Sequence, residues 1–217
     1  MKHTPFLRNA TAIAALAASL LMAGCSVLPA PSPRPALYDF GPGPAAAGAA
    51  GTMPGRPPIA LAGVDAPVRL DGTEMFYRLG YADANELRSY GQSRWSQPPA
   101  QLLRQRLRAA LAATHQVLET EDSATMARAE GRVPDTLRVT LEEFSQFFES
   151  PTRSVALVRV NATLIHATPG GERVLAQRSF SAKQAAPSDD APGGVKALAA
   201  ASDAVAADLA AWVNQPR

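Results

Sequence analysis

This sequence is poor in cysteine, contains no recognisable metal-binding pattern and has only a small excess of positive charge. It contains one cysteine, Cys25, and three histidines, of which His3 lies close to the N-terminus. No HExxH pair, GxSxG elbow or GxxxxGK[ST] loop occurs, so the motifs of zinc proteases, serine hydrolases and ATPases are missing. His115 and His166 stand far apart in the chain with no partner spacing. We therefore expect no enzyme activity, no cofactor and no metal site.

Two pairs of adjacent carboxylates are the remaining candidates for acid–base chemistry. Glu142-Glu143 falls in a segment that alternates like a strand, where neighbouring side chains point to opposite faces unless a bulge intervenes. Asp189-Asp190 follows Pro and Ser in a segment typical of a turn. We interpret both pairs as solvated surface groups.

The first 25 residues carry the clearest targeting signal. Lys2 and Arg8 precede an uncharged run of Ala, Leu and Ile that is too short to span a bilayer comfortably, which is typical of a secretion signal. The run ends in Leu21-Met22-Ala23-Gly24-Cys25, which resembles the lipobox of a bacterial lipoprotein. Residues 1–24 are therefore predicted to be the signal peptide, and Cys25 the lipidated first residue. Fatty acyl chains such as palmitate would then anchor the protein, since each buried methylene contributes about 0.8 kcal/mol.

Cleavage after Gly24 also removes the charge bias. The chain has 21 basic and 19 acidic residues; loss of Lys2 and Arg8 leaves 19 of each. A balanced mature chain gives no reason to expect nucleic acid as a partner. Residue 26 is Ser and not Asp, which in the lipoprotein class favours the outer membrane of a Gram-negative bacterium, facing the periplasm.

A Pro-rich tether and one domain are predicted to follow the anchor. Residues 29–58 hold nine prolines and five glycines, too little apolar surface for stable folding. We assign residues 25–36 to a tether that reaches roughly 30 Å from the membrane. Residues 37–217 then form a single periplasmic domain, and Leu37-Tyr38-Asp39-Phe40 is a short first strand within it.

The domain pattern indicates an α+β fold: a mostly antiparallel sheet with two main helices packed on one face. Residues 59–64, 72–80 and 85–90 resemble strands, and HQVLET is a candidate strand. Three alternating segments, 136–150, 154–167 and 172–184, predict a meander. Helices are expected at 96–115, with Ser96 as N-cap, and at about 193–213, where the apolar stripe consists of Val195, Leu198, Ser202, Val205, Leu209 and Trp212.

Four aromatic or basic side chains are candidates for contact with a partner or with lipid. Phe147 and Phe148 crowd the end of a strand with Phe144, and strict alternation places Phe147 on the face opposite the other two. Core packing and an apolar contact patch both explain them. Tyr90 and Arg94, in YGQSRW, are open to binding or packing in the same way, whereas we interpret Trp95 as structural.

The order of these pieces resembles the ABC-type transport auxiliary lipoproteins, the group that includes paraquat-inducible protein C. The resemblance covers nearly the whole mature chain and rests on the lipobox and on five later segments: Tyr38-Asp39-Phe40-Gly41-Pro42, Met75-Phe76-Tyr77-Arg78, Tyr90-Gly91-Gln92-Ser93-Arg94-Trp95, Leu141-Glu142-Glu143-Phe144 and Arg178-Ser179-Phe180. Residues 121–135 and 45–56 match no part of the pattern.

The resemblance implies a non-enzymatic role in transport. It predicts an outer-membrane lipoprotein that serves a transporter of lipids or other hydrophobic molecules and docks a periplasmic protein with a mammalian-cell-entry (MCE) domain. A ring of several copies that matches a ring-shaped partner is a hypothesis, and phospholipid as a direct ligand stays open. The alternative is an envelope-assembly lipoprotein that regulates a peptidoglycan or outer-membrane machine through protein contacts.

Overall fold

The computed structural model describes residues 34–43, 56–119, 133–168 and 170–215. The chain divides into two compact units, Met1–Arg34 and Pro35–Arg217, and the second of these carries the fold. The predicted signal peptide, Cys25 and most of the tether lie outside the described residues. So does most of the segment 121–135, as well as the loop from residue 44 to residue 55.

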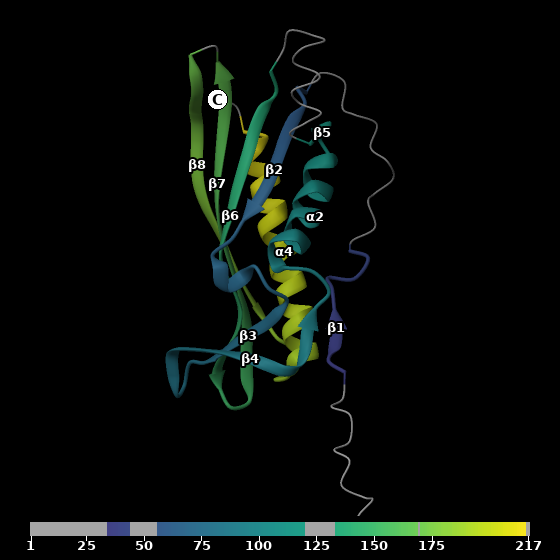
Figure 1. Cartoon of the computed structure of the whole chain (residues 1–217), viewed down its shortest axis with the longest axis vertical. Helices are drawn as coiled ribbons and strands as arrows, with labels where there is room; N and C mark the ends of the chain where they lie inside the picture. Colours follow the sequence, from purple (N-terminus) through teal and green to yellow (C-terminus); the bar gives the residue numbers. More distant parts are fainter. Residues whose placement is uncertain (1–33, 44–55, 120–132, 169, 216–217) are drawn as a thin grey trace, which may run out of the picture. The chain divides into compact units, whose positions relative to one another are not determined.

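The described residues form the predicted α+β fold, with eight strands in one sheet and two α-helices (Figure 1). The strands are β1 (Ala36–Tyr38), β2 (Ile59–Asp65), β3 (Glu74–Leu79), β4 (Asp83–Trp95), β5 (Val117–Leu118), β6 (Asp135–Ser150), β7 (Arg153–Thr168) and β8 (Gly171–Ala185). The helices are α2 (Pro99–Ala112) and α4 (Ala191–Val213), with a short 3₁₀ turn, η1, at Val68–Leu70.

The long strand β6 organises the sheet. One edge pairs with β7 along nearly its full length, and β7 pairs in turn with β8, which confirms the antiparallel meander. The other edge of β6 is shared by two parallel partners: β2 pairs at residues 135–140 and β3 at residues 146–148. From β3 the sheet continues to β4 and β1, and from β2 it continues to β5. Most paired residues lie in the antiparallel pairings.

Both helices cover the same face of the sheet. α4 packs on β7 and β8, and α2 packs on α4 and β2. Every residue of the predicted apolar stripe of α4 is buried, and the Ser202 hydroxyl is satisfied by donating to the Leu198 carbonyl at 2.8 Å. On the sheet, alternate residues of β6 face this layer, so that Leu137, Val139, Leu141 and Phe144 enter the core.

The predicted start of α2 was wrong. The helix begins at Pro99, and Pro98 occupies the N-cap position without a side-chain cap. Ser96 instead donates its backbone N–H to the Tyr38 carbonyl at 2.7 Å, which extends the β1–β4 pairing. Gln97 and Pro98 each precede a proline, and this disfavours the helical conformation at both positions. The prolines therefore set the helix boundary later than Ser96.

Candidate functional site

Where the structure describes the chain, neither His115 nor His166 belongs to a metal-binding cluster. Within the described residues, no group of three or more His, Cys, Asp or Glu side chains is placed to hold a metal ion. The two rings of His115 and His166 contact structural partners. His115 lies within 3.0 Å of the Pro57 carbonyl and 2.9 Å of Asn214 Oδ1, and His166 Nδ1 lies 2.7 Å from Asp135.

Among the described helices, none is both long and apolar enough to cross a membrane.

An aromatic cluster joins β3, β4 and β6. The rings of Tyr77 and Tyr90 lie 4.7 Å apart, and Phe148 meets Tyr77 edge-on at 5.8 Å. Phe148 is buried, whereas Tyr77 and Tyr90 are half-buried. The structure thus brings two of the four candidate contact residues together, with Tyr77 between them. The tyrosines, and not Phe148, present the accessible ring surface of this cluster.

A buried glutamine connects this cluster to the helix layer. Gln146 is 1% exposed; it accepts a hydrogen bond from the Tyr90 hydroxyl at 2.8 Å and donates to Ser154 Oγ at 2.8 Å. Burial raises the pKa of the Tyr90 hydroxyl, with the nearby Tyr77 as a second cause, so the phenol keeps the proton that it donates. A Cβ on Gly194 of α4 would lie 2.1 Å from Gln146 Oε1, so this glycine lets the helix approach the amide.

Arg94 is held by the backbone of its own strand. Its guanidinium donates to the Tyr90 carbonyl and, at 2.9 Å, to the Ser93 carbonyl. Arg94 and Tyr90 are therefore coupled, although Arg94 makes no ring contact within the described residues. Trp95 at the end of β4 is 1% exposed and contacts Phe40 and Phe144, which confirms its structural interpretation. A contact role for Tyr90 and Arg94 stays a prediction.

Phe147 lies on the opposite face of β6, against the turn that follows β3. It pairs with Arg78 of β3 and Val155 of β7, and its ring lies where a side chain on Gly80 would be. The ring is half-buried, so part of it stays accessible at this end of the sheet. β3 pairs with β6 at Leu79 and Phe148, shortly before both strands end, so the turn of the β3–β4 hairpin (residues 80–82) and that of the β6–β7 hairpin (residues 151–152) lie at the same end of the sheet. We call this end the hairpin end.

We predict that Gly80→Ala destabilises the protein by about 1–3 kcal/mol, the usual cost of overpacking. A Cβ at this position would lie 2.0 Å from the tip of the Phe147 ring, so the ring must move. Gly91→Ala in β4 is the matched control, because its Cβ would meet no atom within 4 Å and its effect should stay within about 1 kcal/mol. Urea unfolding of both variants measures the difference; equal midpoints would contradict this placement of Phe147.

The predicted solvated pair Asp189-Asp190 has a structural function at its second residue. Asp190 is the N-cap of α4, and its carboxylate accepts from the Gly193 N–H at 2.8 Å and from Ser188 Oγ at 2.6 Å. These hydrogen bonds, the one from Ser188 first, hold the pKa of Asp190 below its usual value. The cap therefore favours the ionised carboxylate.

This lowered pKa predicts a pH-dependent stability difference. A carboxylate whose pKa falls on folding stabilises the native state above its unfolded pKa of about 3.9, and this is lost as the pH falls through the lower folded value. Asp190→Ala should thus lower the thermal midpoint at pH 7, and its deficit should shrink below about pH 4. Asp189→Ala is the control. If Asp190→Ala lowers the thermal midpoint equally at pH 7 and at pH 3, the ionised carboxylate is not what stabilises the helix start.

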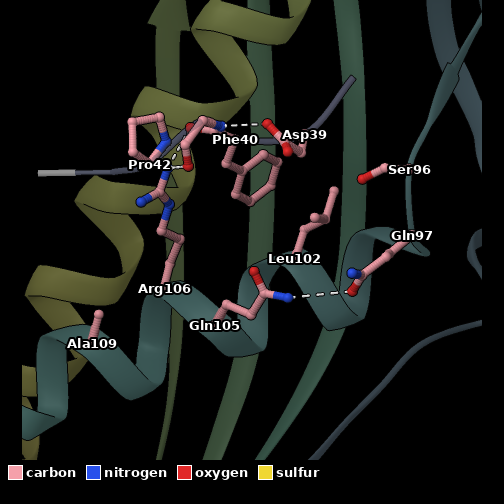
Figure 2. Close-up of a pocket in the computed structure, with 10 residues that line it drawn as sticks. Asp39, Phe40, Pro42, Ser96, Gln97, Leu102, Gln105, Arg106 and Ala109 are labelled. Atoms are coloured by element: carbon pink, nitrogen blue, oxygen red, sulfur yellow. Dashed lines mark hydrogen bonds between the residues drawn. The ribbon is translucent and has the colours of Figure 1, made fainter. Parts of the chain in front are cut away.

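A pocket of about 230 Å³ lies between α2 and the segment that follows β1, residues 39–42 (Figure 2). Arg106 of α2 donates to the carbonyls of Phe40 and Gly41, and its Nε lies 3.2 Å from Asp203 of α4. The Arg106 guanidinium also lies 5.8 Å from the Phe40 ring, which is buried against Trp95. One arginine of α2 therefore fastens the segment that follows β1 to both helices.

Three residues of these sites were not among the sequence-based candidates: Tyr77, Gln146 and Arg106. Tyr77 belongs to the segment Met75-Phe76-Tyr77-Arg78, and this motif of the family resemblance could have identified it as a candidate. Gln146 sits among phenylalanines in an otherwise buried strand, and a polar residue there indicates a hydrogen-bonded partner. Arg106 carries no such signal, because its partners are backbone carbonyls 65 or more residues away in the chain.

The chain is similar to one known family and to solved structures of the same fold. The model of the family described as "ABC-type transport auxiliary lipoprotein component" matches residues 38–210. Protein XCC0632 from Xanthomonas campestris, of the family DUF330, is 20% identical, with a TM-score of 0.58 over 75% of this chain and 88% of that one. The crystal structure of an uncharacterized protein is 18% identical, with a TM-score of 0.59 over 84% and 100%. No curated protein matches.

Proposed function

Because the chain belongs to the family of ABC-type transport auxiliary lipoprotein components, we propose that it is the outer-membrane-anchored part of an MCE-type transport system for lipids or other hydrophobic molecules. In this proposal the domain docks the periplasmic MCE protein of the transporter and does no chemistry itself. The family match over residues 38–210 is the observation that carries the proposal. The anchor and tether predicted from the sequence agree with this role, and so does an accessible aromatic end of the sheet.

The anchor and tether determine where the domain can act. Acyl chains on Cys25 would hold the N-terminus at the membrane, and Ser26 favours sorting to the outer membrane. From Cys25 to Ala36, eleven residues span at most about 40 Å even when fully extended. Since β1 and Arg106 fix the chain from Ala36 onward to the domain, a lipid on Cys25 would keep Ala36 within this distance of the membrane. A periplasmic partner must therefore reach toward the outer membrane to meet it.

We propose the hairpin end as the docking surface. Tyr81, at the tip of the β3–β4 turn, is 48% exposed, and the half-buried rings of Phe147, Tyr77 and Tyr90 lie on the two faces of the adjoining sheet. Aromatic side chains are enriched in protein interfaces because they bury a large area at a low cost in conformational entropy. Lipid could meet the same rings, so the partner's identity must be measured directly.

Site-specific photocrosslinking in intact cells tests this docking surface. A photoreactive phenylalanine analogue replaces Tyr81 or Thr152 at the two turns, or Ala200 on the exposed face of α4 as the control. The proposal predicts adducts with an MCE-domain protein from Tyr81 and Thr152 and none from Ala200. Adducts from Ala200 alone would move the docking surface to the helix layer. A cell-wall enzyme as the crosslinked partner would favour the alternative of an envelope-assembly lipoprotein.

A further inference from the structure

A groove of about 530 Å³ lies along the exposed side of α2, where the helix passes the end of β2. Gly63 and Val64 of β2 form one wall, with Ala100 at the start of α2. Arg104 and Arg108 line the helix side, one turn apart. This groove adjoins the pocket of Arg106, with which it shares Gln97 and Gln105, and none of its lining residues belongs to the hairpin end.

Within the part of the chain that the structure describes, Arg104 and Arg108 share Glu119 as their one counter-ion. Both donate to the carboxylate of Glu119, one to each oxygen, and all three side chains are between 37% and 50% exposed. The group therefore carries two positive charges and one negative charge. In addition, Arg104 Nε is buried and has no hydrogen-bond partner among the described residues. After pairing with Glu119, the two arginines therefore keep a net charge of one positive unit, and the N–H at Arg104 Nε still lacks an acceptor among the described residues.

The remaining polar groups of the groove are neutral amides. Gln101 and Gln105 of α2 line it together with Gln97, which precedes the helix, and Gln105 Nε2 donates to Gln97 Oε1 at 3.3 Å. Among the described residues that line the groove, none carries a carboxylate. An amide rotates to donate or accept as a ligand requires, so the groove presents guanidinium and amide donors to an oxyanion.

We propose that this groove is a binding site for a phosphate ester and that Glu119 takes the place of the anion in the ligand-free protein. A phosphate group has enough acceptor oxygens to bridge two guanidinium groups and an amide at once, and arginine favours such charge-assisted bonds. The groove is much larger than inorganic phosphate, so the ester substituent would lie against Val64 and Ala100. This inference does not rest on the proposed MCE partner. The phosphate ester belongs either to a small soluble molecule or to the headgroup of a phospholipid.

Two soluble probes distinguish these sources. The full acylated lipoprotein, in uncharged maltoside micelles and phosphate-free buffer, is titrated with glycerol 3-phosphate or with dihexanoyl phosphatidylglycerol. Calorimetry gives the affinity, and the ¹⁵N-labelled arginine Nε–Hε signals report Arg104 directly. We expect saturable binding that weakens with added salt and a shifted Arg104 signal. Tighter binding of the glycerol phosphate supports a soluble ester, and tighter binding of the phospholipid supports a lipid headgroup.

Three variants make the assignment specific. Arg104→Gln with Arg108→Gln should weaken binding at least about tenfold, because charged hydrogen bonds are lost. Glu119→Gln should strengthen it, because the competing carboxylate is removed. Arg138→Gln, which breaks an exposed ion pair with Glu172 on the sheet, should leave it unchanged. Absence of saturable binding, or equal affinity in the double arginine variant, overturns the proposal. If that variant fails to fold, unchanged or weaker binding by Glu119→Gln overturns it instead.

Discussion

Replacing Trp95 with alanine should destabilise the protein by about 3–5 kcal/mol, the range typical of a large aromatic removed from a core. Trp95 is 1% exposed and meets the Phe40 ring edge-on at 5.7 Å and the Phe144 ring at 5.6 Å. Phe40 belongs to the first described segment, residues 34–43, and Phe144 to the central strand β6. The indole therefore ties the start of the domain to the middle of its sheet, and its loss leaves a cavity at this junction.

Urea unfolding of the full lipoprotein in uncharged detergent, followed by far-UV circular dichroism, measures this effect. A typical domain has about 5–15 kcal/mol of stability in total, so the predicted loss is a large fraction of it. Tyr81→Ala is the control, because its ring is 48% exposed and its removal should change the stability by less than about 0.5 kcal/mol. A loss below about 1 kcal/mol for Trp95→Ala would contradict its role as a core residue.

Replacing Cys25 with alanine should abolish acylation and, with it, the stable attachment of the domain to the outer membrane. A single acyl chain gives marginal and reversible binding, whereas two or three chains make it nearly irreversible. Because Cys25 is the only cysteine of the chain, no other thiol can replace it. Incorporation of labelled palmitate and the density of the membrane fraction measure the two consequences separately.

The control for this experiment is Val27→Ala, which leaves the lipobox intact. It should incorporate palmitate and fractionate with the outer membrane as the wild-type protein does. Palmitate incorporation by Cys25→Ala at the wild-type level would show that the anchor lies elsewhere. Acylation of the wild type with inner-membrane density would keep the lipobox but refute the sorting prediction drawn from Ser26.

The local elements of this fold were predictable because their patterns are strong. The alternation of Leu137, Val139 and Leu141 is the signature of a strand with one buried face, and the structure places all three in the core. The spacing of apolar residues from Val195 to Trp212 predicted α4 equally well. Phe144 and Phe148 also share one face of β6, although a bulge near Glu142 resets the alternation that precedes them.

The pairing of distant segments was not predictable from these patterns. Nothing in the local sequence indicates that β2 and β3 both pair in parallel with β6, one on each half of its edge. The contact of Gly194 with Gln146 joins residues 48 positions apart, and that of Arg106 with Phe40 joins residues 66 apart. Such contacts depend on tertiary packing, so the candidate site was seen in part, as Tyr90 and Phe148, but not as a connected network.

The most direct test of the central claim is to identify what the native lipoprotein binds. The full acylated protein is crosslinked in intact envelopes and purified, and its protein partners and co-purified lipids are identified by mass spectrometry, with the Cys25→Ala variant as the unanchored control. We predict an MCE-domain protein among the partners of the wild type, and its loss or strong reduction with the variant. A peptidoglycan synthase or outer-membrane assembly protein in its place, with no component of an ABC transporter, would contradict the proposed function.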